Sequence, residues 1–169
     1  MSAIERHVGF PKSRARQVAR RLQEAHILPL GGPGIAPELD AYGFISLLIA
    51  LAADAPLHEA AEAVSTYRAL TPGGVDLTGA PESVDTAGRA LDIFADIAAH
   101  GEPDLLRRDF FEVVSSWPEI AMRRDGAVTR FASVGALASH WQAKGHRKSI
   151  TINGAALVDA IQELFGDSK

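Results

Sequence analysis

The chain has 169 residues, of which 47% are hydrophobic and 22% are charged, and it contains no cysteine. This composition predicts a folded globular protein and excludes disulfides, thiolate metal sites and a cysteine nucleophile. The longest strongly apolar stretch, residues 44–53, is far shorter than the roughly 20 residues that a membrane-spanning helix needs. Since the first ten residues lack the apolar core of a signal peptide, we expect a cytoplasmic protein.

Charge is segregated along the chain behind a formal net charge of −4. Residues 1–30 carry six Lys or Arg against two acids, residues 31–106 carry two against twelve, and residues 107–169 carry nine against seven. Because charges act locally in salt, this pattern predicts a basic N-terminal face on an acidic body. The acidic block is also typical of ordinary solvated helix faces.

The N-terminal two thirds of the sequence predict helices. Ser2 and Glu5 have the spacing of a capping box, which predicts a first short helix. The helix over residues 38–53 is apolar nearly all round in its C-terminal half, as is typical of a central core helix or a subunit interface. Apolar periodicity predicts helices over residues 3–8, 12–27, 38–53, 57–70, 84–99 and 103–115, with loops over 28–37 and 71–82.

The hydrophobic period changes after Pro118, where Asp125 and Gly126 stand between two short runs. An Asp-Gly pair in this setting predicts a hairpin with a type I′ turn. The expected cross-strand pairs are Arg124 with Ala127, Met122 with Thr129, and Ile120 with Phe131. A helix from Ser133 to about Lys144, a strand over 148–152 and a final helix capped by Asn153 complete the chain.

Arginines gather on one side of the helix predicted over residues 12–27. Arg14 and Arg21 lie at the edge of its apolar stripe, and Arg16 and Arg20 point away from it. Arginine suits bidentate contacts to phosphate and guanine, and a helix fits the major groove of DNA. This surface therefore predicts DNA contact, and an ordinary solvated basic face is the alternative.

The span from Ile4 to Pro29, which closes on "RRLQEAHILP", resembles the helix-turn-helix segment of bacterial winged-helix regulators. The longer stretch "RRLQEAHILPLGGPGIAPELDAYGFISLLIALAA" is similar to segments of small phage and prophage-encoded proteins, among them DNA-binding regulators and small terminase subunits. The resemblance implies double-stranded DNA as the partner, bound by a recognition helix. The contacting residues would be Lys12, Ser13, Arg14, Arg16, Gln17, Arg20 and Arg21.

The expected fold is mainly α, with a body of five or six helices followed by a small α+β part that holds the hairpin and one further strand. The expected divisions are a helix-turn-helix-like segment at 1–30, a helical body at 31–116 and an α+β part at 117–169. Because one short recognition helix buries little surface, we expect a homo-oligomer, formed through the apolar helix at 38–53.

A second basic group lies in the C-terminal third of the chain. Its members are Arg123, Arg124, Arg130, Lys144, Arg147 and Lys148. This group would extend a DNA footprint, with the hairpin acting as a wing, or it would protect exposed strands against edge pairing.

The sequence contains no specific catalytic, cofactor or metal motif. His58 and Glu62 share a helix face, but a metalloprotease motif needs a second His at the position of Glu62. Asp92 and Asp96 are one helical turn apart, and we expect them on a solvated face. We therefore expect no enzyme activity, no cofactor and no metal, and an enzyme whose active site leaves no sequence motif stays open as a further alternative. The alternative function is a protein-interaction or structural accessory module that uses the acidic helical surface.

Overall fold

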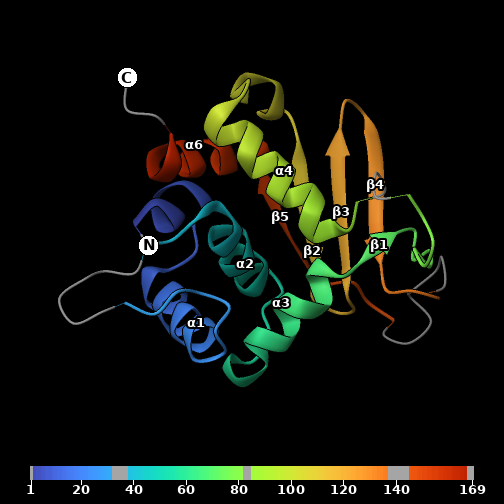
Figure 1. Ribbon diagram of the computed structural model, residues 1–169, viewed down its shortest axis with the longest axis horizontal. Helices are drawn as coiled ribbons and strands as arrows, with labels where there is room; N and C mark the ends of the chain where they lie inside the picture. Colours follow the sequence, from blue (N-terminus) through green and yellow to red (C-terminus); the bar gives the residue numbers. More distant parts are fainter. Residues whose placement is uncertain (1, 32–37, 82–84, 137–144, 167–169) are drawn as a thin grey trace.

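Helices pack against one side of an antiparallel sheet in the computed structural model, which describes residues 2–31, 38–81, 85–136 and 145–166 (Figure 1). The helices are α1 (Lys12–Glu24), α2 (Ala41–Ala52), α3 (Ala60–Arg68), α4 (Ala87–His100) and α6 (Gly154–Phe165). Short helical turns are η1 (Ile4–Val8), η2 (Leu57–Glu59) and η3 (Pro103–Leu106). The expected helix from Ser133 to Lys144 falls largely on residues 137–144, which lie outside the described part.

The sheet has five strands in the order β1-β4-β3-β2-β5, and every neighbouring pair is antiparallel. The strands are β1 (Thr71–Pro72), β2 (Phe110–Val114), β3 (Glu119–Arg124), β4 (Ala127–Ala132) and β5 (Ser149–Asn153). Figure 1 shows α4 lying across one face of this sheet. There the rings of Phe94 on α4 and Phe111 on β2 meet edge to face at 4.6 Å, and both are buried.

The hairpin of β3 and β4 has the predicted register. All three expected pairs are present, including Ile120 with Phe131. Asp125 and Gly126 have φ values of 49° and 81°, and a type I′ turn requires positive φ at both positions. The third predicted strand is also confirmed, since β5 covers Ser149–Asn153. The Asn153 cap is confirmed because the Asn153 side chain accepts a hydrogen bond from the backbone N–H of Ala155 at 2.7 Å.

The prediction of a mainly α fold is wrong, because the protein is a mixed α+β structure built on a five-stranded sheet. The helix expected over residues 103–115 is replaced by the short turn η3 and by β2. Strand β2 lies between β3 and β5 and pairs with both along its whole length. The division expected at residue 116 therefore passes between two hydrogen-bonded strands, and one hydrophobic core joins residues from Ile4 to Ile161.

Helix α2 is the central helix of this core. Asp40 caps it by accepting a hydrogen bond from the backbone N–H of Gly43 at 2.7 Å, and every residue from Gly43 to Ala52 is buried within the chain. Because α2 packs against α1, α3 and α4 of its own chain, it has no apolar face left for a second copy. Of the two alternatives for this helix, the structure shows the core role, and the homo-oligomer stays a prediction.

Candidate functional site

The N-terminal segment forms two helical pieces joined by a tight turn. η1 ends at Gly9, whose φ of 85° lies in the left-handed region, and Phe10 and Pro11 lead directly into α1. A helix-turn-helix unit has the same arrangement, because its two helices are joined by a turn of three or four residues that often contains glycine. The side chain of Glu5 accepts a hydrogen bond from the backbone N–H of Lys12 at 3.1 Å. Glu5 thus caps α1 rather than η1.

Helix α1 is sharply two-faced. Its buried side consists of Ala15, Val18, Ala19 and Leu22, which pack against the core. Its solvent side presents Ser13, Arg16, Gln17, Arg20 and Arg21. This separation follows from the spacing of three and four residues between the apolar positions. The predicted contact residues therefore share one exposed face, with Lys12 and Arg14 partly buried at its margin.

The arginines of α1 differ in what they contact. Arg14 donates to the backbone carbonyl of Ala55 at 2.8 Å, which ties α1 to the segment after α2. Glu24 accepts from Arg21 at 2.7 Å and from Arg20 at 3.1 Å. Arg16 forms no ion pair or hydrogen bond with the described residues. The hydrogen bond from Arg21, assisted by Arg20, holds the pKa of Glu24 below its ordinary value, against the opposing effect of burial.

The first helical piece is fastened to the C-terminal helix. Arg6 and His7 both contact the carboxylate of Glu163 on α6, at 2.8 and 2.6 Å. The hydrogen bond with His7 and the charge of Arg6 lower the pKa of Glu163. These contacts join η1 to α6, and the short turn at Gly9 joins η1 to α1.

The second basic group does not form one patch. Arg124 pairs with the buried Asp109 at 3.0 Å, Lys148 pairs with Asp54 at 2.6 Å, and Lys144 lies outside the described residues. Arg147 is largely buried between two carboxylates of the sheet. Arg123 and Arg130 alone remain exposed together on the sheet face turned away from the helices. In Figure 1 the sheet and α1 lie on opposite sides of the molecule, so the hairpin is not placed as a wing beside α1.

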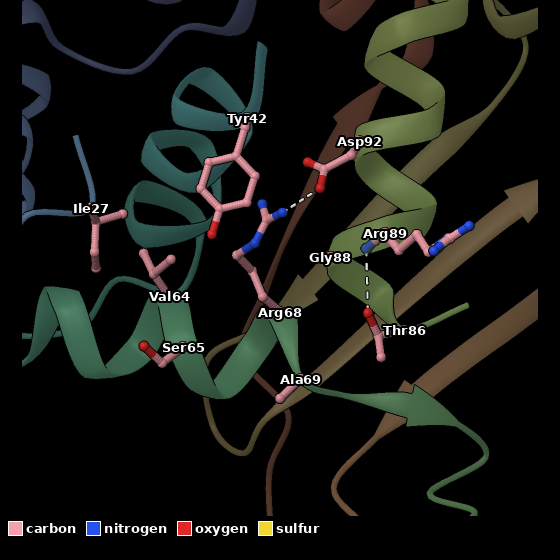
Figure 2. Close-up of a pocket in the computed structure, with 10 residues that line it drawn as sticks. All are labelled: Ile27, Tyr42, Val64, Ser65, Arg68, Ala69, Thr86, Gly88, Arg89 and Asp92. Atoms are coloured by element: carbon pink, nitrogen blue, oxygen red, sulfur yellow. Dashed lines mark hydrogen bonds and ion pairs between the residues drawn. The ribbon is translucent and has the colours of Figure 1, made fainter. Parts of the chain in front are cut away.

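A cavity of about 430 Å³ opens where α2, α3 and α4 meet (Figure 2). The guanidinium carbon of Arg68 lies 3.9 Å from the centre of the Tyr42 ring, and Arg68 also pairs with Asp92. Burial raises the pKa of Asp92 above its ordinary value, although the hydrogen bond and charge of Arg68 oppose the shift. The nearby Asp40 adds to the increase.

This cavity corrects the expectation that Asp92 lies on a solvated face, and sequence reasoning missed it. Arg68 and Asp92 come from different helices, so no local spacing indicates their contact. The cavity offers little chemistry, because the cation and the anion already neutralise each other. Two hydroxyl residues with short side chains line the cavity: Ser65 donates to the carbonyl of Ala61, and Thr86 accepts from the backbone N–H of Arg89. We therefore assign no reaction to it.

Comparison with protein-family models, with curated proteins and with solved structures finds no match for this chain. Within the described ranges, no three His, Cys, Asp or Glu side chains gather closely enough to hold a metal ion. No helix in those ranges has the length and apolar character needed to cross a membrane.

Proposed function

We propose that this protein binds double-stranded DNA through the exposed face of α1. The observation that carries the proposal is the combination of a tight glycine turn at Gly9 with a helix whose buried and cationic faces are cleanly separated. A helix in this setting can enter the major groove with its side chains directed at bases and phosphates.

Charge on α1 supports the proposal despite the acidic body. The helix carries five cationic residues and one carboxylate, that of Glu24. The Arg20 side chain is 81% exposed and the Arg21 side chain 50%. Both ion pairs to Glu24 are therefore solvated and weak, so that phosphates can compete for these guanidinium groups.

The roles within the surface follow from the contacts. Arg16, with Gln17 beside it, is placed to meet base edges or phosphates directly, since neither residue bonds to the described part of the chain. Arg20 and Arg21 contact phosphates of the DNA backbone, which replace the carboxylate of Glu24 as their partner. Arg14 acts mainly in positioning, because its guanidinium is engaged with the carbonyl of Ala55.

The test compares duplex binding by fluorescence anisotropy for the wild type, R16A/R20A and a matched control, R89A/R108A. Arg89 pairs with Asp85 one helical turn away, as Arg20 does with Glu24. Arg108 is exposed without a partner among the described residues, as Arg16 is. The two variants therefore lose the same charge in the same kinds of environment.

We expect R16A/R20A to bind duplex DNA at least tenfold more weakly than the control, with circular dichroism unchanged for both. Equal binding by the two variants would overturn the assignment to α1. Absence of wild-type binding at about 50 mM salt, where non-specific attraction is measurable, would favour the protein-interaction alternative based on the acidic helical surface.

A further inference from the structure

The face of the sheet turned away from the helices carries its own set of exposed groups. Register places Phe110 beside Arg123 and, on its other side, Asn153. Val128 follows Arg123 in the same row. Phe110 and Val128 are 42% and 45% exposed, and they lie on either side of the exposed Arg123.

A depression lies in this face over Ala121. The methyl group of Ala121 is short, and the side chains around it on four strands are longer, so they leave a cavity of about 260 Å³. The residues around it are Phe110, Glu112, Arg123, Val128, Arg130 and Thr151. This volume is below the range of about 300–1,000 Å³ for complete small-molecule sites. It suits one planar group of a larger ligand.

The charge of the depression is positive at its open side. Both oxygens of Glu112 are engaged, since Oε1 accepts from Ser149 at 2.7 Å and Oε2 pairs with Arg147 at 2.9 Å. Arg123 forms no ion pair or hydrogen bond with the described residues. The Arg130 side chain is 62% exposed and lies 3.5 Å from Glu119. The carboxylate at the floor is compensated, so Arg123 and the solvent-exposed side of Arg130, whose other contact is the ion pair with Glu119, can meet an anion.

We propose that this face binds single-stranded nucleic acid, with one base stacked on Phe110 and the adjoining phosphates held by Arg123 and Arg130. An exposed ring on an open sheet with flanking arginines offers stacking and phosphate contacts together. An acidic peptide would use the arginines but not the flat face of Phe110. The site is separate from α1, so it adds to the duplex-binding proposal and does not depend on it.

The probe is a fluorescein-labelled eight-residue thymidine oligonucleotide, measured by anisotropy beside an abasic oligonucleotide of the same length. The variants are F110A, F110L and R123A. The matched controls are L105A, which removes a side chain that is 75% exposed outside the sheet, and R108A. F110L keeps apolar bulk without a ring, so it tests stacking if F110A fails to fold.

We expect F110L and F110A to weaken binding of the thymidine probe by about 5- to 100-fold. R123A should lower the salt slope by about 0.7. L105A, R108A and R16A/R20A should bind as the wild type does, and the abasic probe should bind weakly to all of them. Full binding by F110L, or equal affinity for both probes, would overturn the stacking site. Loss in R123A alone, with competition by polyglutamate, would point to an acidic peptide instead. Loss in R16A/R20A alone would assign single-strand binding to α1.

Discussion

The carboxylate of Glu24 lies 2.7 Å from Nη1 of Arg21, at the end of the helix that presents the cationic face. Its other oxygen lies 3.1 Å from Nε of Arg20. One acidic side chain thus occupies two of the arginines proposed to meet DNA, and a phosphate must replace it in both contacts. Glu24 therefore competes with DNA phosphates for Arg20 and Arg21 and weakens the proposed binding.

Replacing Glu24 by Gln should strengthen duplex binding. E24Q removes a negative charge from the proposed interface and frees Arg20 and Arg21 for phosphates, so we expect a severalfold lower Kd and a steeper salt dependence. The measurement is anisotropy titration against a mixed-sequence duplex. The matched control is D85N, because Asp85 pairs with Arg89 at the start of α4. An equal gain in both variants would indicate net charge alone rather than a surface on α1.

Tyr67 should titrate only at strongly alkaline pH. Its hydroxyl donates to the backbone carbonyl of Val114 at the end of β2, and burial raises its pKa to about 12. Y67F leaves that carbonyl without this donor and should lower the free energy of unfolding by about 1–2 kcal/mol. Urea unfolding measures the loss, and ultraviolet absorbance at high pH measures the ionisation. Ionisation of Tyr67 near pH 10, read from the difference between the wild-type and Y67F titrations, would contradict the buried contact.

The sheet should lose stability in acid through Glu112. Burial acts to raise the pKa of Glu112, but the hydrogen bonds from Ser149 and Arg147 outweigh it and leave the pKa below the ordinary 4.5. Because the folded-state pKa is lowered, ionised Glu112 stabilises the fold fully at pH values above the ordinary 4.5. This contribution is lost as the pH falls through the folded-state pKa. Thermal unfolding of E112Q should therefore depend less on pH in this range than that of the wild type. The exposed Glu62 provides the control E62Q, which should keep the wild-type profile.

Phe94 should be among the most costly residues to truncate. It is fully buried and meets Phe111 edge to face at 4.6 Å, which joins α4 to the sheet. F94A should lower the free energy of unfolding by about 3–5 kcal/mol. I93A, on the exposed side of the same helix, should change it by less than about 1 kcal/mol. Similar losses in urea titrations of the two variants would contradict the packing.

Local signals predicted the parts of the fold that local geometry determines. Asp125 and Gly126 specify a turn whose two residues need positive φ, so the hairpin and its register follow from the sequence. Asn153 marks the start of α6 because a short polar side chain can cap a helix there. The apolar stripe of α1 likewise follows from spacing alone.

Strand β2 shows where such signals fail. Its alternation of exposed Phe110 with buried Phe111 and Val113 is a strand pattern, but Pro103 and Asp104 just before it favour a helix start. They produce only the short turn η3. What makes residues 110–114 a strand is pairing with β3 and β5, and β5 lies about 40 residues further along the chain. The two-residue strand β1 is too short to leave a periodic pattern.

The site was predictable in outline and not in its contacts. The i+3 and i+4 spacing of Glu24 from Arg21 and Arg20 is a local signal that indicates both ion pairs, and sequence reasoning overlooked it. The hydrogen bond from Arg14 to the carbonyl of Ala55 joins residues that are 41 positions apart in the sequence, so local spacing does not indicate it. The ion pairs between the C-terminal basic group and carboxylates depend on the tertiary fold in the same way. Burial of α2 depends on which helices surround it.

The most direct test of DNA binding by α1 is the salt dependence of duplex affinity for the wild type, R16A and R108A. Each phosphate contact contributes about 0.9 to the slope of log K against log salt. We predict a steep slope for the wild type. In R16A the affinity should fall, or the slope should decrease by about 0.9, which corresponds to one phosphate contact. In R108A neither quantity should change. A wild type without measurable affinity at about 50 mM salt, or a slope that R16A and R108A reduce equally, would contradict the account.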